Sequence, residues 1–481
     1  MDSQLRQVAG STQDAGSAPI RALADVLVVG AGISGLTTAF GLKRAGLAVQ
    51  VIDAGAQPGG VIATLRRDGC LFERGPNSAL DTTELIGQLV EQLGLGGEMR
   101  LAAAAADKRY VVRGGVLTAL PTTPAAFLGT RLFSLPAKLA LLREPFVPAA
   151  PAQGEESIAD FVRRRLGPEF LDYAIDPFVA GIYAGDPETI SVQAAFPKLH
   201  ALEQRWGSLI RGQLFGAAER RRQRETAKNR AKSFSFAGGM QVLTDALAAA
   251  VGPLALQTHA ARLTRDADGW FTLWTETQGG PLRYRARALV LATPADQAAV
   301  LLRDHAADAA AALAAIAYAP VASIASSYAR SAIAHPLDGF GCLVPRKEAR
   351  RVLGVLFSSS MYAGRAPEGQ VLLTTFAGGQ RDPALPGLAE DEIAALVQAE
   401  HRALLGASQA PLFQNVTRWT RAIPQYTLGH DGRVARAEAV ARQLPGLFFC
   451  ASWKGGVAVG DCIKNGHLAA DAAAAWLRKS A

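Results

Sequence analysis

The chain has 481 residues, of which 49% are hydrophobic and 19% are charged, and its formal net charge is +8. This length and composition exclude an intrinsically disordered chain and indicate two or three folding units with a large core. The four cysteines form no Cys-x-x-Cys pair, which excludes a disulfide framework and favours a reducing compartment. The positive charge suits an anionic partner but does not choose among nucleic acid, a lipid surface and an acidic substrate.

Residues 1–23 are rich in Ser, Gln, Gly and Ala and lack the apolar centre of a secretory signal. We expect them to form a disordered leader. No later window is long and apolar enough for a transmembrane helix. The alanine-rich run of residues 306–319 predicts a core or surface helix instead.

A βαβ unit follows the leader. The sequence ADVLVVG, residues 24–30, is typical of a strand buried on both faces, and helical spacing follows it. In the motif Gly30-x-Gly32-x-x-Gly35, the glycines permit a tight turn, a close approach to a pyrophosphate and close packing of helix and strand. Asp53 ends the next apolar run, where it is placed to bind ribose hydroxyls. The unit therefore predicts a dinucleotide site at a helix N-terminus.

Two further features favour FAD over NAD. The pair Gly59-Gly60 follows Asp53, and the sequence FERGPNS, residues 72–78, lies beyond the pair. Together they resemble the extended fingerprint of the flavin amine oxidase superfamily, with residues 75–78 as a flavin-contacting turn. Val61 stands where many members have arginine. No second strand-glycine-helix unit offers a seat for reduced nicotinamide.

The rest of the chain alternates between helical and strand-like regions. Residues 121–232 have helical character broken by prolines. They end in a cluster of Arg and Lys, residues 219–232, which we interpret as a solvated helix face or loop. Strand patterns return in residues 233–300 and 320–380, and the C-terminal end predicts a strand, a glycine turn and a long helix.

Four stretches are similar to the protoporphyrinogen oxidase family in particular: residues 107–115 (DKRYVVRGG), 176–191 (DPFVAGIYAGDPETIS), 339–379, and 456–466 (GVAVGDCIKNG). This resemblance implies an α/β and α+β fold with an interrupted Rossmann-like FAD-binding domain, a mixed-sheet substrate-binding domain and a helical, membrane-associating insertion. The implied boundaries are residues 24–106, 233–300 and 426–481 for the first, 107–120 and 301–425 for the second, and 121–232 for the insertion.

The resemblance also implies roles for individual residues. Arg109 would pair with a substrate propionate, and the Gly181 backbone would lie beside the reactive face of the flavin. Leu343, Leu356 and Phe376 would sandwich the flat substrate. The implied FAD contacts are Gly30, Ala31, Gly32, Ile33, Ser34, Gly35, Asp53, Gly59, Gly60, Gly75, Pro76, Asn77, Ser78, Ala260, Ala451, Val457, Ala458 and Val459.

The implied reaction is the oxidation of protoporphyrinogen IX to protoporphyrin IX in haem synthesis. FAD would take three successive hydrides, and molecular oxygen would reoxidise the flavin. A pyrrole proton leaves easily once a cation has formed, which explains why the sequence shows no catalytic base. The seven histidines have no metal-binding spacing, so we expect no metal.

Other functions stay open at this point. The nearest alternative is the same chemistry on coproporphyrinogen III, followed by an amine oxidase or a desaturase. Amine oxidases usually have an aromatic pair at the flavin, whereas Trp453 is alone here. A non-catalytic, membrane-associated binding protein belongs to a different class. Nucleic-acid binding is disfavoured because no aromatic residues accompany the basic cluster.

The expected partners are a porphyrinogen, oxygen and a membrane surface. Residues 127–142 mix apolar and basic positions, which favours peripheral attachment at the cytoplasmic face of a membrane. The resemblance also allows for a homodimer and for hand-over of the product to ferrochelatase.

Overall fold

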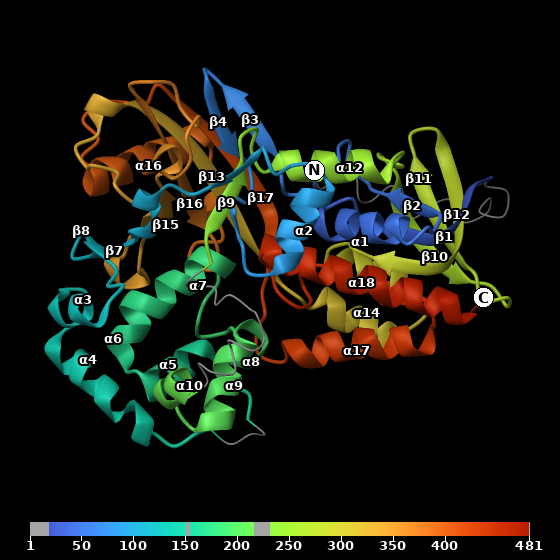
Figure 1. Cartoon of the computed structure of the whole chain (residues 1–481), viewed down its shortest axis with the longest axis horizontal. Helices are drawn as coiled ribbons and strands as arrows, with labels where there is room; N and C mark the ends of the chain where they lie inside the picture. The colour runs from blue at the N-terminus through green and yellow to red at the C-terminus, as the bar shows by residue number, and fades with distance from the viewer. Residues whose placement is uncertain (1–18, 151–153, 216–230, 481) are drawn as a thin grey trace.

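The computed structural model describes residues 19–150, 154–215 and 231–480, which form two sheet-based units beside a helical insertion (Figure 1). The first unit contains a six-stranded sheet in the order β10-β11-β12-β1-β2, with β18 also paired to β12. Strand β1 pairs in parallel with β2 and with β12, which confirms the predicted βαβ unit. The strands are β1 Ile20–Val29, β2 Val49–Ile52, β10 His259–Arg265, β11 Phe271–Thr277, β12 Gly280–Leu291 and β18 Leu447–Phe449.

Helices cover both faces of this first sheet. Along β1, Val26 and Val28 pack into one apolar cluster and Leu27 and Val29 into another, because side chains alternate along a strand. Helices α1, α2, α12 and α18 contribute to the first cluster, and α13, α14 and α17 contribute to the second. Their bounds are α1 Ile33–Arg44, α2 Glu84–Gln92, α12 Gln241–Val251, α13 Ala295–Leu302, α14 Ala307–Ala314, α17 His430–Gln443 and α18 Val459–Ser480.

The second unit contains a seven-stranded sheet in the order β17-β13-β16-β15-β14-β7-β8. Helix α16, Glu390–Leu405, packs Ile393 and Val397 against one face of it. Helix α7, Asp176–Tyr183, contacts β14 and β15. The strands are β7 Tyr110–Arg113, β8 Val116–Ala119, β13 Tyr318–Ala329, β14 Gly341–Leu343, β15 Val352–Leu356, β16 Gln370–Gly378 and β17 Phe413–Pro424.

Two small sheets complete the strands that the structure describes. The first pairs β3 with β4, and Phe72 of β4 packs with Ala325 and Phe413 of the seven-stranded sheet. The second has the order β5-β9-β6. The bounds are β3 Thr64–Arg67, β4 Cys70–Glu73, β5 Ala79–Leu80, β6 Met99–Leu101 and β9 Ser233–Phe236.

The insertion is helical in its described part, as predicted. Its interior is held by buried charges: Arg165, Glu144 and Glu203 are nearly or fully buried, and Arg165 pairs with both glutamates. Its segments are α3 Pro124–Gly129, α4 Leu135–Ala140, η3 Leu141–Phe146, α5 Ile158–Arg165, α6 Pro168–Phe170, η4 Leu171–Ile175, α7, α8 Val192–Ala195, α9 Pro197–Trp206 and α10 Leu209–Phe215. The predicted basic cluster lies outside the described residues, apart from Ala231 and Lys232.

Two predicted boundaries are wrong. The leader of residues 1–23 is too long, because Ile20 and Leu23 already pair with β12 in the first sheet. The substrate-binding domain does not begin at residue 301, because α14 and Ile316 pack against the first sheet and not the second. Helix propensity in an alanine-rich run does not say which sheet the helix covers.

In the described ranges, no helix has the length and apolar character of a bilayer-spanning segment.

Candidate active site

The turn between β1 and α1 has the shape that a dinucleotide requires. Gly30 has a φ of +111°, and a β-carbon there would lie 2.6 Å from the Ala292 carbonyl oxygen. A β-carbon on Gly35 would overlap the Gly30 carbonyl, whereas one on Gly32 would meet nothing within 4 Å. Gly30 and Gly35 thus permit the tight turn, and Gly32 leaves open space for a phosphate. The other predicted contacts of this turn, Ala31, Ile33 and Ser34, are buried.

Asp53 lies just beyond β2 and faces the same turn. Its carboxylate accepts hydrogen bonds from the Ala31 amide and the Gly55 amide, each at 2.6 Å. These contacts hold the carboxylate at the end of the parallel strands, which is where a ribose binds in this type of fold.

A cavity of about 350 Å³ opens beside Asp53, which is within the usual size range of ligand pockets. It is lined by Val29, Gly30, Gly32, Ile52, Asp53, Ala54, Gly60, Thr258, His259, Ala260, Ala292, Thr293, Pro294, Gln297 and Leu301. Ala260, predicted from a distant part of the chain, therefore lies in the same cavity as the glycine turn. The open face at Gly32, the acidic acceptor and the volume fit the adenosine and pyrophosphate half of FAD.

The second glycine turn packs onto the first. The Gly59 amide donates a hydrogen bond to the Ala31 carbonyl at 2.8 Å. Val61 is 42% exposed, and its carbonyl contacts Gly75 so closely that no side chain fits at residue 75. The Asn77 side chain donates to the Gly75 carbonyl at 3.2 Å. Residues 75–78, which include Pro76, are all partly exposed, as a turn that receives a ligand must be.

The C-terminal turn, residues 450–458, leads from β18 to α18. A β-carbon on Gly466 would lie 2.7 Å from the Thr37 Cβ atom, so α18 and α1 cross in close contact. Val459 begins α18 and shares an apolar cluster with Ile33 of α1. The start of α18 therefore lies beside the dinucleotide turn. Of the predicted contacts here, Ala451 is buried, Val457 is half-buried and Ala458 is exposed.

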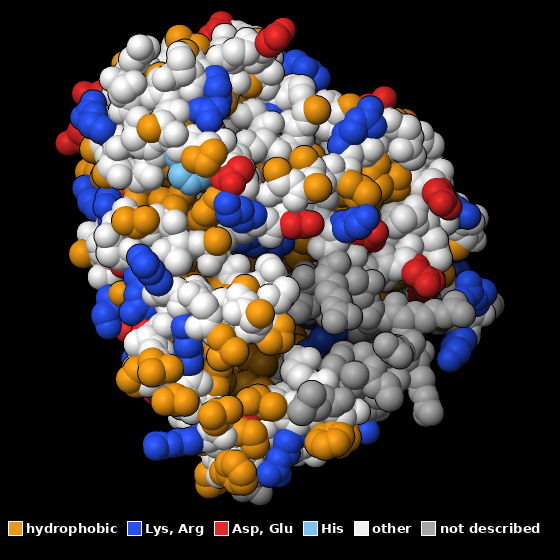
Figure 2. Space-filling model, turned by 60° about the vertical axis from the view of Figure 1, so that its left-hand side comes forward, with side chains coloured by type: hydrophobic (Ala, Val, Ile, Leu, Met, Phe, Trp, Pro, Cys, Tyr) orange, Lys and Arg blue, Asp and Glu red, His pale blue; other side chains and the backbone are white. Residues whose placement is uncertain are grey.

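Leu343, Leu356 and Phe376 come together on one face of the seven-stranded sheet. Gly354 pairs with Leu343 on one side and with Phe376 on the other. Leu356 lies two residues beyond Gly354, so strand alternation places it on the same face. A β-carbon on Gly181 of α7 would lie 2.9 Å from the Leu343 Cδ2 atom. We call this apolar sheet face, with Gly181 against it, the slot; its role as the substrate site stays a prediction. Figure 2 shows a hollow lined by hydrophobic side chains in the lower part of the molecule.

Arg109 belongs to the edge of this slot. Leu343 pairs with Val111, which is two residues after Arg109, so alternation places Arg109 on the slot face. The guanidinium carbon lies 5.2 Å from the ring centroid of Phe340. Phe340 and Leu356 pack against the same small cluster. Arg109 is exposed and forms no ion pair with any described residue.

Shared neighbours connect the slot with the predicted flavin turns. Tyr362 hydrogen-bonds to Ser78 and belongs to the cluster against which Leu356 packs. Val457 of the C-terminal turn packs against the same cluster as Leu343. These clusters connect the turn at Ser78 and the turn at Val457 with the sheet face that carries Leu343 and Leu356.

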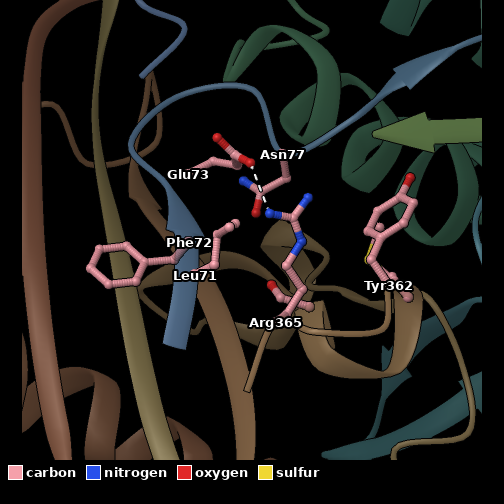
Figure 3. A pocket seen from close by; sticks show the side chains of 8 residues that line it. Leu71, Phe72, Glu73, Asn77, Tyr362 and Arg365 are labelled. Carbon is pink, nitrogen blue, oxygen red and sulfur yellow. Dashed lines mark hydrogen bonds and ion pairs between the residues drawn. The ribbon is translucent and has the colours of Figure 1, made fainter. Parts of the chain in front are cut away.

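A buried ion pair beneath the turn of residues 75–78 was not predicted. Glu73 and Arg365 are each 4% exposed, and their side chains approach to 3.2 Å (Figure 3). Glu73 also accepts hydrogen bonds from the Met240 amide at 2.9 Å and from Thr64 Oγ1 at 2.6 Å. Burial raises the pKa of the Glu73 carboxyl and lowers the pKa of the Arg365 guanidinium. The pair ties β4 to the loop before β16.

We expect the substitution Glu73→Gln to lower the free energy of unfolding by about 3 kcal/mol, because it leaves Arg365 charged, buried and unpaired. Urea unfolding of the holoenzyme measures this change. Asp266→Asn is the matched control, since Asp266 pairs with Arg285 at the surface and its loss should cost less than about 1 kcal/mol. Equal losses of unfolding free energy in the two variants would show that the buried ion pair stabilises the fold no more than the surface pair does.

Trp453 takes no part in an aromatic cage. Its side chain is fully buried and donates a hydrogen bond to the Thr293 carbonyl at 3.0 Å. It is therefore a core residue beneath the C-terminal turn, which weakens the amine oxidase alternative. No group of His, Cys, Asp and Glu suited to a metal ion occurs within the residues that the structure covers.

The fold and this site define a class of protein. The family of flavin-containing amine oxidoreductases matches residues 33–474, so the chain belongs to that family. It is a flavin-dependent oxidoreductase, and the dinucleotide turn identifies its flavin as FAD.

Within that family, the chain is similar to protoporphyrinogen oxidases. The chloroplastic protoporphyrinogen oxidase of Oryza sativa subsp. japonica is 35% identical over 98% of this chain and 92% of its own length. The coproporphyrinogen III oxidase of Propionibacterium freudenreichii is 31% identical over 93% and 90%. A crystal structure from Exiguobacterium sp. 255-15 has a TM-score of 0.77 at 24% identity and covers 95% of this chain and 99% of that chain. The predicted resemblance and fold class are confirmed.

Proposed function

We propose that this flavoenzyme oxidises protoporphyrinogen IX to protoporphyrin IX in haem synthesis, with molecular oxygen as the final electron acceptor. The proposal is supported by an apolar sheet face with Arg109 at its edge, in a chain 35% identical to a protoporphyrinogen oxidase. A porphyrinogen is broad, flat and largely apolar, and its propionates favour a cation. The slot would supply the apolar contacts through its sheet face and the cation through Arg109.

Bound FAD would supply a two-electron acceptor for each of the three oxidation steps. Leu343, Leu356 and Phe376 would hold the macrocycle flat and exclude water from it. Gly181 would let its edge come close, and Arg109 would fix its orientation through a propionate. The pyrrole N–H protons would leave to water, so these side chains position the substrate and take no proton.

Both porphyrinogens should be assayed on one enzyme preparation, by following the rise of porphyrin fluorescence. We expect protoporphyrinogen IX to have the higher kcat/KM. The reason is that coproporphyrinogen III brings two more propionates to a slot with a single predicted cation, Arg109. A strong preference for coproporphyrinogen III would replace this function with the alternative.

We expect Arg109→Met to raise KM for protoporphyrinogen by about tenfold or more, because a charge-assisted hydrogen bond contributes about 1.5–3 kcal/mol. The FAD content should not change. Lys108→Met is the matched control, since the neighbouring Lys108 is also exposed but is already paired with Asp338 at 2.6 Å. An unchanged KM in Arg109→Met, or an equal rise of KM in both variants, would show that Arg109 does not bind a substrate propionate.

We also propose that the insertion attaches the enzyme to the cytoplasmic face of a membrane. Four large side chains with helical spacing, Leu135, Leu139, Leu142 and Phe146, are 68%, 54%, 70% and 80% exposed. Two exposed arginines accompany them: Arg131 precedes the four residues and Arg143 lies among them. Figure 2 shows hydrophobic and basic side chains gathered over this lower part of the molecule. Such a mixed surface suits an anionic lipid interface.

Co-sedimentation with vesicles of anionic lipid tests this attachment. We expect the double variant Leu139→Asp/Leu142→Asp to bind at least about tenfold more weakly, because each leucine buried in the interface contributes about 1.5–3 kcal/mol. Leu412→Asp is the control, since Leu412 is 59% exposed but lies on the substrate-binding unit. Binding that is equal in wild type and in the double variant would contradict the attachment.

A further inference from the structure

The C-terminal turn is held by side chains from other segments at three successive carbonyl groups. Tyr426 Oη donates to the Ser452 carbonyl at 2.7 Å, and His430 Nε2 donates to the Trp453 carbonyl at 2.9 Å. Asn465 Nδ2 donates to the Lys454 carbonyl at 3.1 Å. A turn with this many outside contacts has one preferred shape.

Of these three side chains, Tyr426 has the largest number of hydrogen bonds to the turn. Its hydroxyl group also accepts a hydrogen bond from the Gly456 amide at 2.9 Å. The hydroxyl therefore bridges residues 452 and 456 across the turn. The Tyr426 ring is 2% exposed and stacks on His430, with 4.1 Å between the ring centroids and 13° between their planes. Burial lowers the pKa of His430 to about 4, so this ring stays neutral at physiological pH.

Tyr426 is also linked to the substrate slot. The preceding residue, Gln425, donates from Nε2 to the Tyr183 carbonyl at the end of α7, at 2.8 Å. The rings of Tyr183 and Tyr426 lie 5.7 Å apart. Helix α7 carries Gly181, so a short path of contacts runs from the slot to the C-terminal turn.

We propose that Tyr426 is a positioning residue for the cofactor: its hydroxyl group holds residues 452–456 in the shape that receives the flavin. This inference rests on the predicted flavin contact at residues 451 and 457–459. Without the hydroxyl, the partly buried Ser452 carbonyl and Gly456 amide lose their shared partner, and the turn relaxes to find others.

Tyr426→Phe tests the proposal, and Tyr183→Phe is its matched control. Tyr183 is equally buried and adjacent, but its hydroxyl group donates to the Ala195 carbonyl, away from the turn. The first measurement is FAD release from the diluted holoenzyme, followed by flavin fluorescence. The second is hydrogen exchange in the peptide that covers residues 452–458.

We expect Tyr426→Phe to weaken FAD binding by about tenfold and to speed exchange in this peptide, because the turn loses the hydrogen bonds of one neutral hydroxyl group. Tyr183→Phe should stay within about twofold of wild type. The variant Gly456→Ala distorts the same turn while Tyr426 is intact, because the added β-carbon would lie 2.5 Å from Asp461 Oδ2. This variant should also release FAD faster than the wild type.

Normal FAD retention in Tyr426→Phe or in Gly456→Ala would overturn the proposal, and so would an equal loss in Tyr183→Phe. These measurements use no substrate. A wild-type enzyme that retains FAD but oxidises no porphyrinogen would therefore refute the proposed function without affecting this inference.

Discussion

The substitution Gly32→Val should give a folded but colourless protein without oxidase activity. A β-carbon on Gly32 meets nothing within 4 Å, and the backbone angles of −75° and 178° suit a β-branched residue. The valine side chain would therefore fill the space reserved for the pyrophosphate without straining the turn. We expect FAD affinity to fall by at least about 100-fold, measured by flavin absorbance after gel filtration.

Gly87→Val is the control for this effect. Gly87 lies in α2, and a β-carbon there also meets nothing within 4 Å. The control should keep its FAD and its activity. A yellow, active Gly32→Val enzyme would show that the pyrophosphate does not lie at the β1–α1 turn.

The second large effect is expected at Gly181. Valine at this residue would place its β-carbon 2.9 Å from Leu343 Cδ2 and its methyl groups in the slot. We expect kcat/KM for protoporphyrinogen to fall by at least about 100-fold, because the macrocycle can no longer come close to the flavin. The FAD content should stay close to that of the wild type, because Gly181 does not line the cavity that fits the adenosine and pyrophosphate half of FAD.

Gly181→Ala and Leu343→Ala separate slot closure from loss of fold. The alanine variant should lose less activity than the valine variant, and adding Leu343→Ala to Gly181→Val should restore part of it. Full activity in Gly181→Val would show that the substrate does not bind beside α7. Loss of FAD together with activity would mean that the helix supports the cofactor instead.

The dinucleotide turn was predictable because its determinants are local. A buried strand, three spaced glycines and the terminal Asp53 lie within about 30 residues. Each of these features has its own geometric role in a dinucleotide-binding turn. The structure shows the geometry behind these expectations for Gly30, which has a positive φ, and for Gly35, which contacts Gly30 too closely for a side chain. The binding of a ribose by Asp53 stays a prediction, and its carboxylate accepts hydrogen bonds from the Ala31 and Gly55 amides. The strands that carry Leu343, Leu356 and Phe376 were also expected, and their register puts the three side chains on one face.

Features that depend on contacts distant in sequence were not predictable. Glu73 and Arg365 are 292 residues apart, and neither residue type alone distinguishes a buried ion pair from a solvated one. Tyr426 and Gly456 likewise meet only in the folded chain. The same reason explains the wrong leader boundary, since Ile20 joins a strand through its pairing with Arg283 rather than through an apolar pattern of its own.

We expect a porphyrinogen in the apolar slot to pass its electrons to the FAD of this chain. Anaerobic mixing of the purified enzyme with protoporphyrinogen IX, followed by flavin absorbance, measures this electron transfer. We predict that the yellow absorbance is bleached within a turnover while porphyrin absorbance rises, and that air restores the yellow colour. A flavin that stays oxidised with protoporphyrinogen IX but is bleached by an aliphatic amine would show that the enzyme is an amine oxidase and not a porphyrinogen oxidase.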